Sequence, residues 1–232
     1  MKYSDVAKDR FHKMVEYSPA NACAAHRRKD GIALDAGVAE PGGWTAAKLL
    51  IEGLIGGRGQ VNFGDMEFGP DRLPTLELFL DDPVMAYQNA YQEKDGLFGI
   101  QGEDASYALG LGICDRIDAA LPGGNFVLAS STSILGSVFA ASRAIPLAIG
   151  MLLKGGVRPE EIQWAWGVCP LPILCDDENE MQKRMDRALK EDSVVSVWVR
   201  GEDEALQKLL NAYDGGCVRI HNLKTAKTLL KA

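Results

Sequence analysis

A single arginine interrupts the longest apolar stretch of the chain. Between Phe126 and Leu153, Arg143 is the only charged side chain. A guanidinium buried without a partner would cost several kcal/mol, so Arg143 must either pair with an acid or bind an anionic ligand. The sequence leaves both alternatives open. Arg143 is therefore the first residue for which we consider a function.

A turn rich in hydroxyl groups comes shortly before this arginine. It follows a compact apolar strand at 126–129 and leads into a helix, and a helix N-terminus presents unsatisfied N–H groups to an anion. The same hydroxyls are also common helix caps. The small residues that follow would let a flat ligand or another backbone approach the helix closely. The candidate ligand-binding residues here are Ser130, Ser131, Thr132, Ser133, Gly136 and Ser137.

Other patterns that often carry chemistry give weaker signals. The histidines His12, His26 and His221 have no metal-binding spacing, so we expect no metal site. Glycines at 56–59 follow a helix and precede a strand, which is the reverse of a dinucleotide-binding fingerprint, so we interpret them as a helix stop. Acidic clusters are typical of solvated helix starts. From one such cluster, Glu103 and Asp104 are kept as candidates for a general acid or a ligand contact.

Composition restricts the class of protein further. The 232 residues carry 25 basic and 32 acidic side chains, a formal net charge of −7. This balance argues against a nucleic-acid binder and a polybasic membrane anchor. The five cysteines are odd in number and form no CxxC pair, which is typical of reduced thiols in a cytoplasm. The start of the chain lacks the apolar core of a signal peptide, and we expect no membrane-spanning run and a cytoplasmic location.

Helices and strands must alternate to position these residues. Apolar spacing and Gly or Pro punctuation predict a loop over 97–113 with a short helix to residue 121, and a rigid segment at Pro170 and Pro172. This order predicts an α/β fold, with a layered α+β arrangement also compatible. The predicted helices cover 3–17, 44–55, 82–92, 138–154, 177–191 and 203–211. The predicted strands cover 31–38, 60–63, 75–80, 126–129, 161–167, 194–199 and 217–220.

Several segments taken together resemble one protein family. The strand and Ser/Thr turn at 126–133, the Gly-Ser-Val at 136–138 and the following Arg143 form the strongest segment. Residues 35–44 and 56–61 resemble an N-terminal signature, 167–173 a proline segment, and 218–227 a C-terminal strand and turn. The shared order spans most of the chain. On these segments the chain resembles methenyltetrahydromethanopterin cyclohydrolase.

This resemblance carries expectations for fold and ligand. It implies hydrolysis of the cyclic methenyl form of tetrahydromethanopterin to the open formyl form, without a metal or redox cofactor. It also implies one unit over 1–232 with two lobes, whose boundary the sequence leaves open, and a pterin in a cleft between them. The assembly implied is a homo-oligomer, with a homotrimer expected. The further ligand contacts implied near the pterin are Pro41, Gly42, Gly43 and Trp44.

The catalytic pattern departs from the family at one position. The resemblance makes Arg143 the family's catalytic arginine, but Pro146 stands where a glutamate is expected three residues later. Proline offers no proton acceptor, and it should kink or restart the helix. Three functions follow as alternatives: a pterin-binding protein with altered ring hydrolysis, an inactive scaffold or regulator of pathway enzymes, or a step of pterin cofactor biosynthesis on the same fold.

Overall fold

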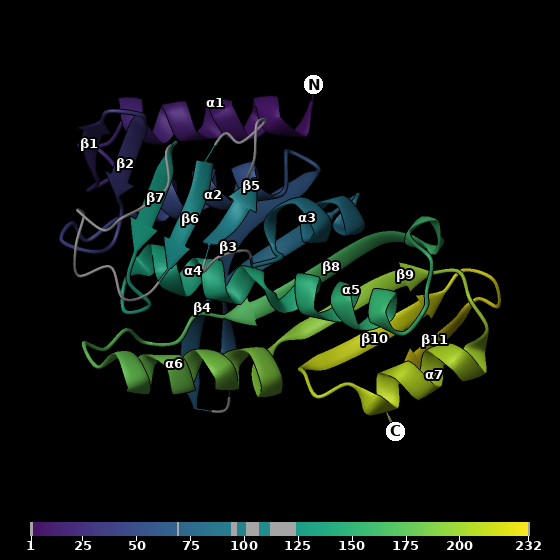
Figure 1. Ribbon diagram of the computed structural model, residues 1–232. Helices are drawn as coiled ribbons and strands as arrows, with labels where there is room; N and C mark the ends of the chain where they lie inside the picture. Colours follow the sequence, from purple (N-terminus) through teal and green to yellow (C-terminus); the bar gives the residue numbers. More distant parts are fainter. Residues whose placement is uncertain (1, 69, 94–96, 101–106, 112–123, 232) are drawn as a thin grey trace. The chain divides into compact units, whose positions relative to one another are not determined.

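The computed structural model describes residues 2–68, 70–93, 97–100, 107–111 and 124–231. Helices and strands alternate along the chain, which confirms the α/β class (Figure 1). The chain divides into two compact units. Unit 1 comprises residues 1–57, 88–140 and 174–182, and unit 2 comprises residues 58–87, 141–173 and 183–232. A cleft between two lobes stays a prediction.

Unit 1 is built on a sheet with the strand order β1-β2-β7-β6-β5 in the described residues. The central strands β2, β7 and β6 run parallel, whereas β1 and β5 are antiparallel to their neighbours. All four residues of β7 are buried, as expected for a strand in the middle of a parallel arrangement. The strand bounds are β1 Ala24–Arg28, β2 Gly31–Asp35, β5 Leu97–Ile100, β6 Tyr107–Leu111 and β7 Phe126–Ala129.

Two packed helices contribute to the core of unit 1. Helix α1 (Tyr3–Glu16) packs on α2 (Trp44–Leu54), and Phe11 and Leu50 are among the side chains buried there. The predicted helix stop is confirmed, because Gly56 and Gly57 follow α2 with φ of 60° and 68°. The Gly57 N–H donates to the Glu52 carbonyl at 3.1 Å, which closes the end of the helix.

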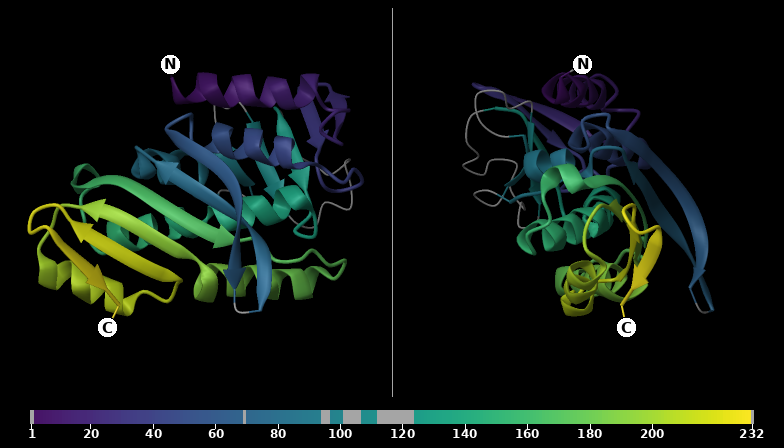
Figure 2. Two further views of the ribbon diagram at one scale, coloured as in Figure 1. Left: turned by 180° about the vertical axis from the view of Figure 1, so that it is seen from behind. Right: turned by 90° about the vertical axis from the view of Figure 1, so that its right-hand side faces the viewer.

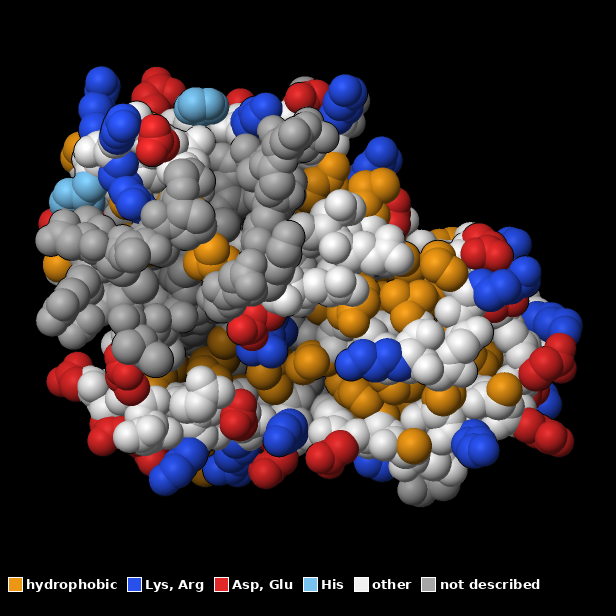
Figure 3. All heavy atoms as spheres, viewed as in Figure 1, with side chains coloured by type: hydrophobic (Ala, Val, Ile, Leu, Met, Phe, Trp, Pro, Cys, Tyr) orange, Lys and Arg blue, Asp and Glu red, His pale blue; other side chains and the backbone are white. Residues whose placement is uncertain are grey.

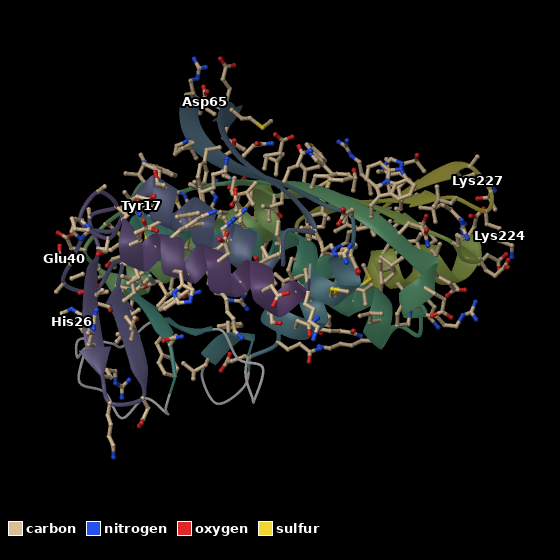
Figure 4. All side chains as sticks on the ribbon, turned by 90° about the horizontal axis from the view of Figure 1, so that it is seen from above. Tyr17, His26, Glu40, Asp65, Lys224 and Lys227 are labelled. Atoms are coloured by element: carbon tan, nitrogen blue, oxygen red, sulfur yellow. The ribbon has the colours of Figure 1, made fainter. Side chains whose placement is uncertain are left out.

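Unit 2 is built on a sheet with the strand order β11-β10-β9-β8-β4-β3. Helix α5 (Ala144–Lys154) packs on β8 and β9, and α7 (Asp203–Ala212) packs on β10 and β11. The long hairpin of β3 and β4 carries Asp65 near its end (Figures 2 and 4). The strand bounds are β3 Gly59–Phe68, β4 Asp71–Leu80, β8 Ile162–Pro170, β9 Val194–Val199, β10 Cys217–Asn222 and β11 Lys227–Leu230. Further helical segments are α3 (Pro83–Ala90), a 3-10 turn (Pro159–Glu161), α6 (Glu178–Arg187) and a π turn (Ala188–Asp192).

Several elements differ from the sequence prediction. The loop predicted over 97–113 is wrong, because β5 and β6 pair there across the sheet. Strands β1 and β11 were not predicted, and β3 and β4 extend into a ten-residue hairpin. The short helix predicted up to residue 121 lies outside the described residues. The rigid proline segment is confirmed in part by Pro170, which ends β8.

The helix predicted over 138–154 begins earlier and is divided in two. Helix α4 (Ile134–Ser142) ends before Arg143, and α5 restarts at Ala144. By length and composition alone, the combined 21-residue stretch could cross a membrane. However, 72% of the most apolar 18-residue segment of this stretch is buried inside the structure, as in a core helix of a soluble protein. Apolar side chains also gather at the surface of unit 2 between α5 and α7 (Figure 3).

Candidate functional site

Two loops meet at one edge of the sheet of unit 1. Strands β2 and β7 are parallel, with Asp35 opposite Leu128, so both chains leave the sheet at the same edge. The Ala36 N–H donates to the Leu128 carbonyl and the Ser130 N–H to the Gly37 carbonyl, both at 2.9 Å. Ligands of open α/β sheets bind at the carboxyl ends of such strands. We call residues 36–43 and 130–133 the paired loops.

A buried carboxylate organises the first of the paired loops. Asp35 is fully buried, and its Oδ1 accepts the N–H groups of Gly37 and Val38 at 3.1 and 2.8 Å. Its Oδ2 accepts the N–H groups of Ala39 and Glu40 at 2.9 and 3.2 Å. Four backbone donors therefore surround one charge. This role of Asp35 was not predicted, although an acid two residues before Gly37, at the end of a strand, is the signal that could have indicated it.

Ser133 caps the helix that follows the second loop. Its Oγ accepts the Gly136 N–H at 3.0 Å and donates to the Ser130 carbonyl at 2.7 Å. Ser130 Oγ and Thr132 Oγ1 lie 2.8 Å apart, so they share a hydrogen bond. Ser133 is buried, whereas Ser130, Ser131 and Thr132 are partly exposed. The cap predicted from the sequence is confirmed, and three hydroxyl groups stay within reach of solvent.

Two glycines allow close contacts at the hydroxyl-rich turn, Gly37 between the paired loops and Gly136 between the turn and α4. A Cβ atom added to Gly37 would lie 2.3 Å from Ser133 Oγ. A Cβ atom added to Gly136 would lie 2.0 Å from the Ser130 carbonyl oxygen. The close approach predicted at Gly136 is therefore confirmed, and the group that approaches is the chain's own turn. Ser137, one residue later on α4, is also buried.

The remaining predicted ligand contacts lie at the start of α2. Gly42 has φ of 65°, and its N–H donates to the Ala22 carbonyl at 2.9 Å. Gly43 precedes the helix without a side-chain cap, and Trp44 begins it with 43% of its surface exposed. Trp44 is therefore not a core residue. Pro41 is exposed, and so is the neighbouring Glu40 (Figure 4).

A thiol lies beside this loop, but it is not poised for chemistry. Cys23 is 6% exposed, and burial together with the negative charges of Asp35 and Glu40 raises its pKa to about 12. In unit 2, burial and the charge of Asp192 raise the pKa of Cys169 to about 12 as well. Thiolate is the reactive form, so neither cysteine acts as a nucleophile near neutral pH. No cluster of three potential metal ligands occurs in the described part of the chain.

Arg143 belongs to unit 2, whereas the hydroxyl-rich turn belongs to unit 1. Arg143 directly follows the C-terminal end of α4, and Ser133 caps the N-terminal end of that helix. Arg143 is partly buried, and its carbonyl accepts the Leu147 N–H at 2.9 Å. The predicted helix restart occurs at Ala144, so Pro146 falls in the first turn of α5, where the helix does not need its N–H. Glu103 and Asp104 lie outside the described residues.

Comparisons with known proteins agree on one family. The Cyclohydrolase (MCH) family matches residues 4–92 and 115–215 of this chain. A methenyltetrahydromethanopterin cyclohydrolase of Methanospirillum hungatei is 24% identical over 241 residues, which cover 86% of this chain and 76% of that protein. One from Methanosphaerula palustris is 25% identical over 216 residues, which cover 76% and 69%. The chain belongs to the Cyclohydrolase (MCH) family, as a divergent member.

The family match separates the candidate residues into two groups. The matched ranges include both paired loops and Arg143. They leave out residues 93–114, which contain Glu103 and Asp104. The paired loops therefore combine a family match with a built geometry, whereas the two acids lie outside both the matched ranges and the described residues.

Proposed function

We propose that this chain binds a methenyltetrahydromethanopterin-type pterin and that its ring-opening activity is weak or absent. The observation that carries the proposal is Pro146, a buried residue in the first turn of α5 at the position of the expected glutamate. The two cyclohydrolases similar to this chain are named for that pterin. Family membership supports the ligand, and the proline argues against the usual reaction.

The paired loops are the proposed contact surface for the ligand. Ser130, Ser131 and Thr132 offer partly exposed hydroxyl groups beside the start of α4. Trp44 offers an exposed aromatic face at the start of α2, and a flat ring can stack there. Asp35 holds the backbone of the first loop in place without contacting the ligand. This arrangement suits a neutral or weakly charged ring with several hydrogen-bonding groups.

The missing step is the transfer of a proton from water. Hydrolysis adds water to the methenyl carbon, breaks one of its two bonds to nitrogen, and leaves a formyl group on the other nitrogen. The water must lose a proton as it attacks, so a positioned acceptor is needed. Pro146 cannot accept it, and Asp35 is fully buried with its oxygens engaged by four N–H groups. Arg143 alone can orient an acid but cannot replace one.

An absorbance assay with methenyltetrahydromethanopterin tests the proposal. Isothermal calorimetry should detect binding to the natural chain, and the assay should show hydrolysis slower than by a family enzyme by a factor of about 100 or more, the usual contribution of a general base. Pro146→Glu should raise the rate, because it places a carboxylate one turn from Arg143. Pro146→Ala is the matched control, since it removes the proline and adds no acid.

Two results would overturn the proposal. Rapid hydrolysis by both the natural chain and Pro146→Ala would show that another group accepts the proton. Absence of binding heat at millimolar ligand would remove the pterin itself. In that case the scaffold or the biosynthetic function would remain.

The other expectations from the resemblance complete the proposal. We propose a homo-oligomer, with three copies as the expected number, a cytoplasmic location, and no metal or redox cofactor. Association with other enzymes of tetrahydromethanopterin-linked one-carbon metabolism belongs to the same proposal. Light scattering after size-exclusion chromatography should give the mass of three chains. The mass of one chain would remove the trimer without affecting the ligand.

A further inference from the structure

A groove of about 460 Å³ lies within unit 2 and includes no residue of the paired loops. Three segments form it: the end of the β3 and β4 hairpin, the residues that end and follow β8, and α6 with its π turn (Figure 1). Its volume lies within the range of roughly 300–1,000 Å³ typical of small-molecule sites. The groove is therefore large enough for one ligand of modest size.

Most of the groove is apolar. Phe68 and Leu73 of the hairpin face it, together with Pro172 and Ile173 of the segment after β8. Ile173 is 69% exposed, which is unusual for so apolar a side chain. Proline fixes its own backbone angle, so the wall made by this segment changes little when a ligand enters. Such a wall favours a flat apolar or aromatic body.

Two arginines provide the polar end of the groove. Arg184 and Arg187 both line it and lie three residues apart on α6, a spacing that places them side by side. Arg184 Nη1 donates to the Ile173 carbonyl at 2.9 Å, which ties α6 to the apolar wall. One acid, Asp192, is also among the lining residues, so the cations outnumber it.

The ion pair of Arg187 is weak enough to exchange for a ligand. Arg187 Nε lies 3.3 Å from Glu191 Oε2, and the two side chains are 71% and 65% exposed. Pairs this exposed contribute only about 0–1 kcal/mol. A guanidinium also binds a carboxylate or phosphate through two parallel hydrogen bonds, which a single Glu191 contact does not satisfy.

From these features we propose that the groove binds an amphipathic organic anion. The apolar body lies against Phe68, Pro172 and Ile173, and the anionic group, a carboxylate, phosphate or sulfonate, contacts Arg187 and Arg184. The proposal goes beyond the pterin function, because the groove shares no residue with the paired loops. It can also fail independently of that function, since no pterin is needed to test it.

Fluorescence titration with 8-anilinonaphthalene-1-sulfonate tests the groove on the full chain. Saturable binding of one probe per chain is expected, and Arg187→Gln should weaken it about tenfold, or about 1.4 kcal/mol. Arg158→Gln is the matched control, because Arg158 is similarly exposed and pairs with acids elsewhere in unit 2. Its affinity should stay within about twofold of the natural chain.

A neutral probe and a set of competitors sharpen the result. N-phenyl-1-naphthylamine lacks the sulfonate, so it should bind about tenfold more weakly than the anionic probe. Phenyl phosphate, benzoate and inorganic phosphate then separate the anionic group from the apolar body, and only the first two should compete. Equal binding of both probes, or an Arg187→Gln affinity equal to that of the control, would overturn the proposal. Circular dichroism confirms that each variant is folded.

Discussion

The paired loops of unit 1 and the groove of unit 2 use polar groups in opposite ways. In the loops, the chain itself satisfies the charge of Asp35 and the hydroxyl of Ser133 through short contacts to backbone groups. In the groove, Arg187 is exposed and only loosely paired. The first region is fixed in shape before any ligand arrives, whereas the second can rearrange around one. Substitutions should therefore damage stability in the loops and binding in the groove.

Asp35→Ala should give the largest difference between the two regions. The change removes the acceptor of four backbone N–H groups inside a closed site, so the free energy of unfolding should fall by about 3–5 kcal/mol. Arg187→Gln in the groove should change it by less than about 0.5 kcal/mol. Urea denaturation followed by circular dichroism measures both. Similar values for the two variants would contradict the contrast between the regions.

Gly136→Ala should be the next most harmful change. In an ordinary helix this substitution stabilises by about 1 kcal/mol, but here the new methyl group would lie 2.0 Å from the Ser130 carbonyl oxygen. We expect a net loss of about 1–3 kcal/mol, because the Ser130 carbonyl cannot move away without disturbing its hydrogen bond from Ser133 Oγ. Gly64→Ala in β3 is the control, since its Cβ atom would meet only Thr75 Oγ1, at 3.3 Å. A stabilised Gly136→Ala variant would show that the loops are flexible.

Ser133→Ala tests the cap alone and should have a smaller effect. Loss of the bond to the Gly136 N–H should lower the free energy of unfolding by about 1 kcal/mol. Ser131→Ala, in the same turn but only partly buried, should lower it by less than about 0.5 kcal/mol. Thermal melts of the two variants give the comparison, and an equal shift in both would remove the special role of Ser133.

The smallest predicted effect is a pH dependence in unit 2. His221 stacks on Trp198 with ring centroids 4.6 Å apart, and partial burial, followed by the charge of Arg219, lowers its pKa below the usual 6.5. Below pH 6.5 the unfolded chain binds this proton more readily than the folded chain, so stability falls as the pH drops through the folded pKa.

His221→Phe keeps an aromatic ring and removes the titration. The free energy of unfolding should therefore fall less between about pH 7 and pH 5 in this variant than in the natural chain. Urea denaturation at both pH values measures the difference. An equal decrease in the two proteins would assign the pH dependence to other groups.

Local signals in the sequence were sufficient for some elements and not for others. Three features were predicted correctly because their own residue types determine the local structure. They are the apolar strand at 126–129, the turn of Ser133 and the double glycine after α2. Strand β1 reads Ala-Ala-His-Arg-Arg and is a strand only because β2 pairs with it. The glycines near β5 and β6 indicated a loop. These segments are strands because they pair with other strands, and a contact between distant residues leaves no local signal in the sequence.

The candidate site shows the same limit. The family resemblance included both loops among its matching segments, but only the fold shows that backbone hydrogen bonds join them. The role of Asp35 needs four donors that come from its own turn, a geometry that residue types alone do not reveal. Helix α4 begins at Ile134, whereas the periodicity placed the helix start four residues later, at Val138.

Cys23 and Cys169 are buried, protonated thiols, and each can report when the unit around it opens to solvent. A thiol held inside the fold reacts with an alkylating agent only when the surrounding structure opens to solvent. Cys23 belongs to unit 1 and Cys169 to unit 2. Their labelling rates, resolved by peptide mass spectrometry, therefore give two separate opening free energies from one sample. Equal rates would mean that the units open together, and unequal rates would show which half of the chain leaves the native state first.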